Sequence, residues 1–591
     1  MRNIQRLTRR EFGIAVGGGI AAAATLGAQG PSDAAVLDLA DWSYFWYGVE
    51  RATLARGTVV NGGQMFVERW IPAEVRHAYP VVLIHGGYGQ GSDWLSTVDG
   101  RRGWTSRFLE AGYKVYVLDR PGQGRNPYQP FVHGLFDAQA PTFEKMAAEM
   151  KRDVDDPRVA QAVASMNQPM ANNAVTQQLW TSRGSLLLDD IGPAVLVTHG
   201  DGGGFARATA NARPALVKGV VSVASMEPPE PSAAWIAANV DPLAPVTAIA
   251  RPAANRESTS LKLADQGCFW VGVRKKTMSY GTIPQGQMFV QYMVPAERRH
   301  PYPVILIHGG GAQGTHMMGL GGRPGWVHYF VQSGYAVYWI DRPSYGRSPY
   351  HPDALGPSHL NNVPPYEALI NATNVFKTAQ WPGPGGMDDP FIGQFMACES
   401  GNTSDEAFHT DLVWAGGVEL VDRIGPCIIH GHAFGGFFGW GVADRRPSLV
   451  KAIVCMEING NPFERQLRWG LTAQPMTYDP PAASLTDFRL VDRVPPPDSP
   501  KPIASPYKLQ ADPARQWKNL KGIPIAWMTS EDGAGGSPVA NVEFLKQVGC
   551  SVDMLRLRNY GITGNGNLML MERNNRDVFR VLSEWLDAKR L

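Results

Sequence analysis

Short apolar runs alternate with longer amphipathic segments along most of this chain. The runs at 81–84 and 304–307 each end in a glycine-rich loop, and further apolar runs follow at 115–118 and 337–340. Runs of this length are typical of buried strands, whereas the segments between them have the length and periodicity of helices. Strands that are apolar on both sides need helices on both faces of their sheet. The pattern therefore predicts an α/β fold with a mostly parallel sheet flanked by helices.

This pattern occurs twice. Residues 64–87 read QMFVERWIPAEVRHAYPVVLIHGG, and residues 287–310 read QMFVQYMVPAERRHPYPVILIHGG. The similarity returns at 193–203, which read PAVLVTHGDGG, and at 426–436, which read PCIIHGHAFGG. Repetition this close over so long a span indicates a tandem duplication.

Only the second copy continues beyond its sixth strand, through IPIAWMTSEDG at 523–533, a further strand and a C-terminal helix. The first copy stops after a strand near Ala224. We therefore predict a truncated N-terminal unit at 36–265 and a complete C-terminal unit at 266–591. Because an open sheet edge needs cover, we expect the two units to pack together, with the second unit or the 228–265 connector over the last strand of the first.

The first 34 residues have the pattern of an export signal. Arg9 and Arg10 precede a run rich in glycine and alanine that ends near Ala28. Paired arginines before a weakly hydrophobic run resemble the twin-arginine signal of bacteria. The run falls short of the ~18 strongly apolar residues that a membrane anchor needs. We expect a periplasmic or secreted protein whose mature chain has no membrane span.

Composition narrows the classes of partner and cofactor. A net charge of +2, with 44% hydrophobic and 18% charged residues, describes a globular protein without the basic excess of a nucleic-acid binder. The five cysteines have no CxxC spacing, and we interpret them as structural. His308, His316, His430 and His432 are spread without the spacing of metal ligands. We expect no nucleic-acid partner, no metal and no cofactor.

One segment has the frame of a catalytic elbow but lacks the nucleophile. Residues 428–436 read IIHGHAFGG, so an apolar strand runs into a tight, glycine-rich turn, and a helix begins toward Trp440. This order resembles the G-x-S-x-G elbow of the α/β-hydrolase superfamily, whose turn lifts the serine above the sheet. Ala433 occupies the place of that serine, and its methyl group cannot attack a carbonyl. In the first copy the place belongs to Gly200, and we expect the side chain of the next residue, Asp201, to point elsewhere.

Further motifs extend the resemblance to esterase-like members of the superfamily that carry an HGGG loop, and it covers nearly the whole mature chain, twice. The loop is formed by His308, Gly309, Gly310 and Gly311. In such proteins this loop, together with the residue after the elbow, here Phe434, supplies the backbone N–H groups of an oxyanion hole. The resemblance therefore implies a pocket that binds a partly negative oxygen.

The resemblance also assigns places to the acid and the base of a catalytic triad. Glu457 ends the sixth strand of the second copy and Asp532 follows the seventh; either could be the acid, and we favour Glu457, with Glu227 as its counterpart in the first copy. Similar sequences read GNGH after the last strand, whereas this chain reads GNGN and ends that motif at Asn567. No histidine follows His432. The nucleophile and the general base are therefore both replaced.

These replacements favour an exported binding protein of carboxylic-ester-hydrolase ancestry, a pseudoenzyme that takes a small ester or carbonyl ligand or a partner. The alternative is an active enzyme, either an ester hydrolase or a lyase or isomerase that uses the oxyanion loop and Glu457. A third possibility, that Ala433 replaces the serine of an otherwise active esterase, explains neither Asn567 nor Gly200. The fold by itself does not choose among these reactions.

Overall fold

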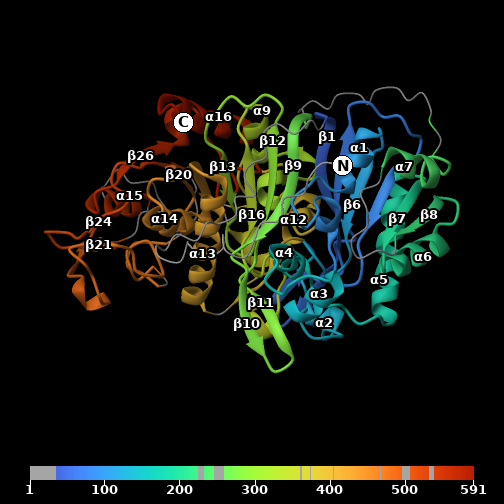
Figure 1. The fold of residues 1–591 in the computed structure, drawn as a ribbon. Helices are drawn as coiled ribbons and strands as arrows, with labels where there is room; N and C mark the ends of the chain where they lie inside the picture. The colour runs from blue at the N-terminus through green and yellow to red at the C-terminus, as the bar shows by residue number, and fades with distance from the viewer. Residues whose placement is uncertain are drawn as a thin grey trace, which may run out of the picture.

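A computed structural model gives the fold of most of the chain (Figure 1). It describes residues 35–223, 232–244, 246, 259–359, 363–372, 375–403, 405–458, 460–465, 467–495, 506–530 and 538–591. The predicted export signal at 1–34, Glu227 and Asp532 lie outside the described residues.

One mixed sheet of 14 strands runs through the molecule. From one edge to the other its strands are β26 (Ser551–Arg556), β25 (Pro524–Thr529), β20 (Val450–Met456), β19 (Cys427–His432), β13 (Val304–Ile307), β16 (Val337–Asp341), β12 (Met288–Pro295), β9 (Leu261–Val271), β1 (Leu37–Tyr47), β4 (Met65–Pro72), β6 (Val115–Asp119), β5 (Val81–Ile84), β7 (Ala194–His199) and β8 (Val217–Val223).

Both units use the same strand order. In the second unit β9, β12 and β16 are joined antiparallel, and β16, β13, β19, β20, β25 and β26 then run parallel. In the first unit β1, β4 and β6 are joined antiparallel, and β6, β5, β7 and β8 run parallel. The first unit ends at its sixth strand, β8, where the second continues with β25 and β26. The predicted fold class and the duplication are confirmed.

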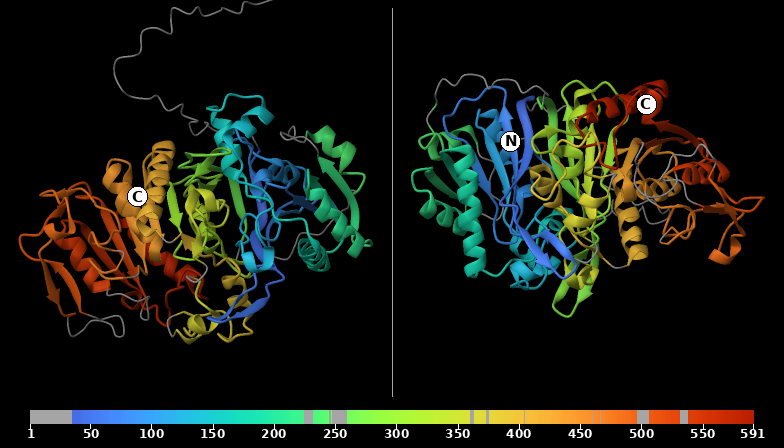
Figure 2. Two further views of the ribbon diagram at one scale, coloured as in Figure 1. Left: turned by 90° about the horizontal axis from the view of Figure 1, so that it is seen from below. Right: turned by 180° about the vertical axis from the view of Figure 1, so that it is seen from behind.

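Helices cover both faces of this sheet, and the two units lie side by side (Figure 2). The main covering helices are α1 (Trp104–Glu110), α5 (Ala174–Ile191), α6 (Gly202–Ala212), α9 (Trp326–Gln332), α13 (Glu406–Ile424), α14 (Gly436–Arg445), α15 (Pro538–Gln547) and α16 (Asn575–Ala588). Side chains of α1, α9 and α16 share one apolar core that extends through both units. A second core under α13, α14 and α15 and a third under α5 and α6 belong to one unit each. No described helix is both long and apolar enough to cross a membrane.

The two units meet at their first strands, in the middle of the sheet. Leu37–Leu39 of β1 pairs antiparallel with Leu261–Leu263 of β9. Since β9 begins at Leu261, the boundary predicted at residue 265 falls inside this strand. The joint therefore makes one continuous sheet out of two copies of the same half.

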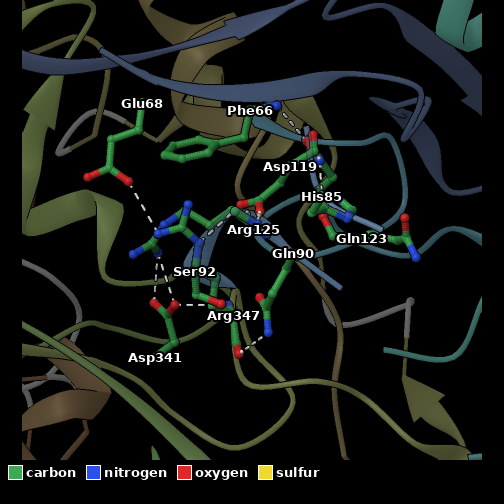
Figure 3. A network of polar contacts seen from close by, with 12 residues as sticks. Phe66, Glu68, His85, Gln90, Ser92, Asp119, Gln123, Arg125, Asp341 and Arg347 are labelled. Carbon is green, nitrogen blue, oxygen red and sulfur yellow. Dashed lines mark hydrogen bonds and ion pairs between the residues drawn. The ribbon is translucent and has the colours of Figure 1, made fainter. Parts of the chain in front are cut away.

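Two buried arginines cross this joint in opposite directions (Figure 3). Arg125 of the first unit lies 3.0 Å from the Asp341 carboxylate of the second. Arg347, which occupies the matching place in the second copy, lies 3.2 Å from Asp119 and 3.2 Å from Glu68 of the first. All five side chains are fully buried. Each unit thus supplies the arginine that pairs with buried carboxylates of the other.

The open edge of the first unit lies at the end of the sheet away from the joint. Leu243 of the connector packs against the edge strand β8. A Cβ atom added to Gly219 of this strand would lie only 2.6 Å from the Leu243 side chain. Trp235, in the short helix α7 (Ala233–Asn239), packs against the apolar core that extends through both units. Val220 of β8 is still 44% exposed. Within the described residues, the connector and not the second unit covers one face of this strand, and alternate side chains stay open to solvent.

Candidate functional site

The elbow of the second unit has the strained turn that the sequence predicts. Strand β19 ends at His432, a 3₁₀ turn spans Ala433–Gly435, and α14 begins at Gly436. Ala433 has a φ of 47°, a left-handed conformation that costs a residue with a Cβ about 1–2 kcal/mol. Glycine is required beside it, since a Cβ on Gly431 would collide with the backbone of Gly435.

Hydrogen bonds from His308 and Arg342 hold the glycine-rich loop in place. His308 is buried, its Nδ1 donates to the Gly309 carbonyl at 2.8 Å, and its Nε2 accepts from the Arg342 backbone N–H at 3.0 Å. The Arg342 guanidinium also donates to the Gly309 carbonyl, at 2.6 Å. Burial holds the pKa of His308 well below its usual value, so the ring is neutral. His308 therefore positions the loop, and both of its ring nitrogens are already engaged.

The hydrogen bonds to the Gly309 carbonyl fix the direction of the following N–H group, that of Gly310. In a trans peptide the C=O and N–H point to opposite sides, so the Gly310 N–H points away from His308 and Arg342. A Cβ on Gly309 would lie 3.2 Å from the Ala433 side chain, and one on Gly310 would lie 3.2 Å from the Phe434 ring. The loop and the elbow are therefore in close contact, as an oxyanion hole requires.

Asn567, which the resemblance assigns to the place of the catalytic histidine, lies against His432. His432 Nε2 donates to the Asn567 backbone carbonyl at 2.9 Å, while Asn567 Oδ1 is buried and has no hydrogen-bond partner in the part of the chain that the structure describes. Burial lowers the pKa of His432 to about 4. The structure therefore brings His432 and Asn567 together behind Ala433, but the Asn567 amide cannot take up a proton near neutral pH.

Of the two candidate acids, Glu457 lies within the described part of the chain. It follows β20, has a φ of 49° and is 4% exposed. Its Oε1 accepts a hydrogen bond from the Ser530 backbone N–H at 2.5 Å, at the end of β25. This contact ties the ends of two neighbouring strands together.

Comparisons with known proteins agree with this geometry. Residues 81–287 match a family model described as alpha/beta hydrolase family, and residues 302–495 match one described as alpha/beta hydrolase fold. The chain belongs to the α/β-hydrolase superfamily. A curated relative, the probable secreted lipase phiG of Fungal sp. (strain ATCC 74256), is 34% identical over 319 residues, which are 51% of this chain and 86% of that protein.

Solved structures of similar hydrolases each align with about half of this chain. A novel bacterial esterase is 22% identical with a TM-score of 0.39, covering 57% of this chain and 99% of its own. The naproxen esterase of Bacillus subtilis is 14% identical with a TM-score of 0.27, covering 54% and 92%. An esterase of Thermogutta terrifontis is 10% identical with a TM-score of 0.29, covering 55% and 100%.

The fold also groups three side chains that the sequence did not connect. His316 Nε2 lies 3.2 Å from Cys398 Sγ and 3.7 Å from Glu399 Oε1, and all three residues are buried. Burial raises the pKa of Glu399 to about 8 and lowers that of His316 to about 3. Glu399 lies against Gly311 of the oxyanion loop, where a Cβ would collide with its carboxylate. The spacing along the chain did not indicate this group, because 82 residues separate His316 from Cys398.

The first unit of this α/β-hydrolase has a braced loop too, but a different elbow. His85 Nδ1 donates to Gly86 at 2.9 Å and its Nε2 accepts from the Arg120 N–H at 3.0 Å. Gly200 has a φ of 47°, the same as Ala433. The Asp201 carboxyl group lies against Gly87, the counterpart of Gly310, as the Phe434 ring lies against Gly310 in the second unit. The acidic side chain takes up space beside this loop, so the first elbow is not suited to an oxyanion.

A cavity of about 1540 Å³ opens over this first elbow. Its wall combines the first unit's loop and tryptophans, including Trp94 and Trp104, with Trp270 of β9 and Glu419 of α13 from the second unit. Residues from both copies thus enclose it, which the sequence of either copy alone could not indicate.

Proposed function

We propose that this α/β-hydrolase binds an ester or other small carbonyl compound without hydrolysing it. The observation that carries the proposal is the retained elbow: Ala433 keeps the strained φ of 47° although it bears no reactive atom. Strain of this kind persists when the surrounding structure enforces it, and it is concentrated at functional sites. The braced glycine loop beside Ala433 supports the same conclusion.

The ligand's carbonyl oxygen would lie between the loop and the elbow. Backbone N–H groups of Gly310, Gly311 and Phe434 are the donors we assign to it, since donors fixed in advance stabilise a partly negative oxygen at low cost. The curated relative, which is named as a probable secreted lipase, supports the ester class. The paired arginines of the N-terminus and the relative's name as a secreted lipase support export to the periplasm or the medium.

The test is hydrolysis of an activated nitrophenyl ester by four proteins: the parent, Ala433→Ser, Asn567→His and the double variant. Nucleophile and base act as a unit, so each single variant should stay within about 10-fold of the parent. The double variant should gain at least ~10²-fold, the usual contribution of a positioned base. Thermal-shift measurements with short esters should show binding by the parent.

Two results would overturn the proposal. Turnover by the parent at the rate of the double variant would mean that other residues carry out the chemistry. A parent whose unfolding temperature no ester raises would mean that the elbow no longer binds a carbonyl compound. The single variants serve as the folding controls, because each carries one of the two substitutions of the double variant.

A further inference from the structure

We propose that His316, Cys398 and Glu399 form a zinc site of three protein ligands beside the oxyanion loop. The proposal goes beyond the binding function above and does not depend on it. His316 belongs to the short helix α8 (Thr315–Met318) directly after the glycine loop, and Cys398 and Glu399 follow α12 (Pro390–Met396). Two separate segments of the second unit thus supply the three ligands.

The first argument is distance. One ligand atom from each residue lies within 4.8 Å of the other two. Sγ and Nε2 are 3.2 Å apart, and Nε2 and Oε1 are 3.7 Å apart. Two ligands of one tetrahedral zinc, with bonds of about 2.0–2.3 Å, are separated by about 3.3–3.8 Å. Small rotations of the side chains would bring all three atoms to a common ion.

The second argument is direction. A catalytic Cys–His–acid arrangement uses both ring nitrogens, one facing the nucleophile and the other facing the acid. Here Cys398 Sγ and Glu399 Oε1 both face the same nitrogen, Nε2 of His316. The other nitrogen, Nδ1, is buried and has no hydrogen-bond partner among the described residues. Donors that converge on one point suit a shared cation and do not suit a proton relay.

The third argument is charge. Glu399 has a side chain only 6% exposed, and the imidazole of His316, 3.7 Å away, is the one basic group that the described residues bring to it. Isolating a carboxylate from water without a cation is costly. A thiolate and a carboxylate together carry two negative charges, which one divalent zinc ion balances. Thiolate, imidazole and carboxylate are also the ligand types that zinc takes in proteins, whereas magnesium and calcium prefer oxygen.

Three protein ligands leave one position of a four-coordinate zinc free. Because Glu399 lies against Gly311, that position would be close to the oxyanion loop. The ligand it would take is water or an oxygen of a carbonyl or carboxylate compound. The ion would thus stand beside Gly311 of the oxyanion loop.

The experiment is metal binding by the purified full chain. After removal of metal by a chelator and return of zinc, elemental analysis should find about one zinc ion per chain, with a raised unfolding temperature. With Co²⁺ in its place, the near-ultraviolet absorption of a cobalt–thiolate bond should appear. Cys398→Ser should abolish that absorption, and His316→Gln and Glu399→Gln should each weaken binding at least ~100-fold, more than loss of an outer-sphere partner does. The matched control is Cys455→Ser, since Cys455 in β20 is also fully buried and has no ligand neighbours of this kind among the described residues.

The parent protein alone can overturn the proposal, so a variant that fails to fold does not leave it undecided. Less than a tenth of an equivalent of retained zinc, together with a cobalt spectrum that lacks the thiolate absorption, would rule out the site. Loss of the absorption in Cys455→Ser, with Cys398→Ser unchanged, would place the metal elsewhere.

Discussion

At the scale of single residues, the two elbows form a natural comparison. Ala433 and Gly200 have the same φ of 47°, but only Ala433 has a Cβ. Ala433→Gly should therefore raise the free energy of unfolding by about 0.5–1 kcal/mol, since relief of the left-handed strain exceeds the entropic cost of glycine. Gly200→Ala should lower the free energy of unfolding by a similar amount. No described atom lies within 4 Å of the Cβ position, so we expect strain alone to act there. Urea unfolding of the three proteins measures both changes.

The control is Ala443→Gly in the last turn of α14, where an ordinary helical alanine is buried. Glycine there should lower stability by about 1 kcal/mol. If Ala433→Gly destabilised the protein as much as Ala443→Gly, the elbow would not hold the left-handed conformation, and the argument for a retained site would lose its basis.

At the scale of structural elements, the crossed arginines hold the ends of β6 and β16 together across the joint. Arg125→Met should lower the free energy of unfolding by about 3–5 kcal/mol, because it leaves the fully buried Asp341 without its cation. Combining it with Asp341→Asn should cost less than the sum of the two single changes. A double-mutant cycle in urea measures this coupling.

An exposed pair provides the comparison for that cycle. Arg580 and Glu584 of α16 are paired at 3.1 Å, with both side chains 55% exposed. Arg580→Met should change stability by less than about 1 kcal/mol. Additive effects of Arg125→Met and Asp341→Asn would show that the two residues do not interact across the joint.

At the scale of the whole molecule, the apolar core that runs through both units should make them unfold together. Chains of two domains often unfold in separate steps. Here the core beneath α1, α9 and α16 is shared, and the sheet is continuous through β1 and β9. Differential scanning calorimetry should therefore show a single transition whose calorimetric and van't Hoff enthalpies agree. Two resolved transitions, or early loss of the first unit in limited proteolysis, would show that the joint is weaker than its burial indicates.

Much of the architecture followed from the sequence by itself. The duplication, the fold class and the elbow at Ala433 can be recognised from local signals, namely apolar runs of strand length and glycines where the chain turns tightly. Such signals act between neighbouring residues, so they can be recognised without knowing where distant segments lie. The assignment of Asn567 to the place of the base came from the resemblance to similar sequences, which carry a histidine there.

Only the tertiary structure decided how the two copies are joined and which of their residues meet. It joined β1 to β9, crossed Arg125 and Arg347 between the units, and turned Asp201 toward Gly87. It also brought His316 to Cys398 and Glu399 from 82 residues away. The physical reason is the same in each case. Buried charges and ligand sets depend on which distant segments the shared core brings within a few ångströms, and no local pattern in the sequence contains that distance.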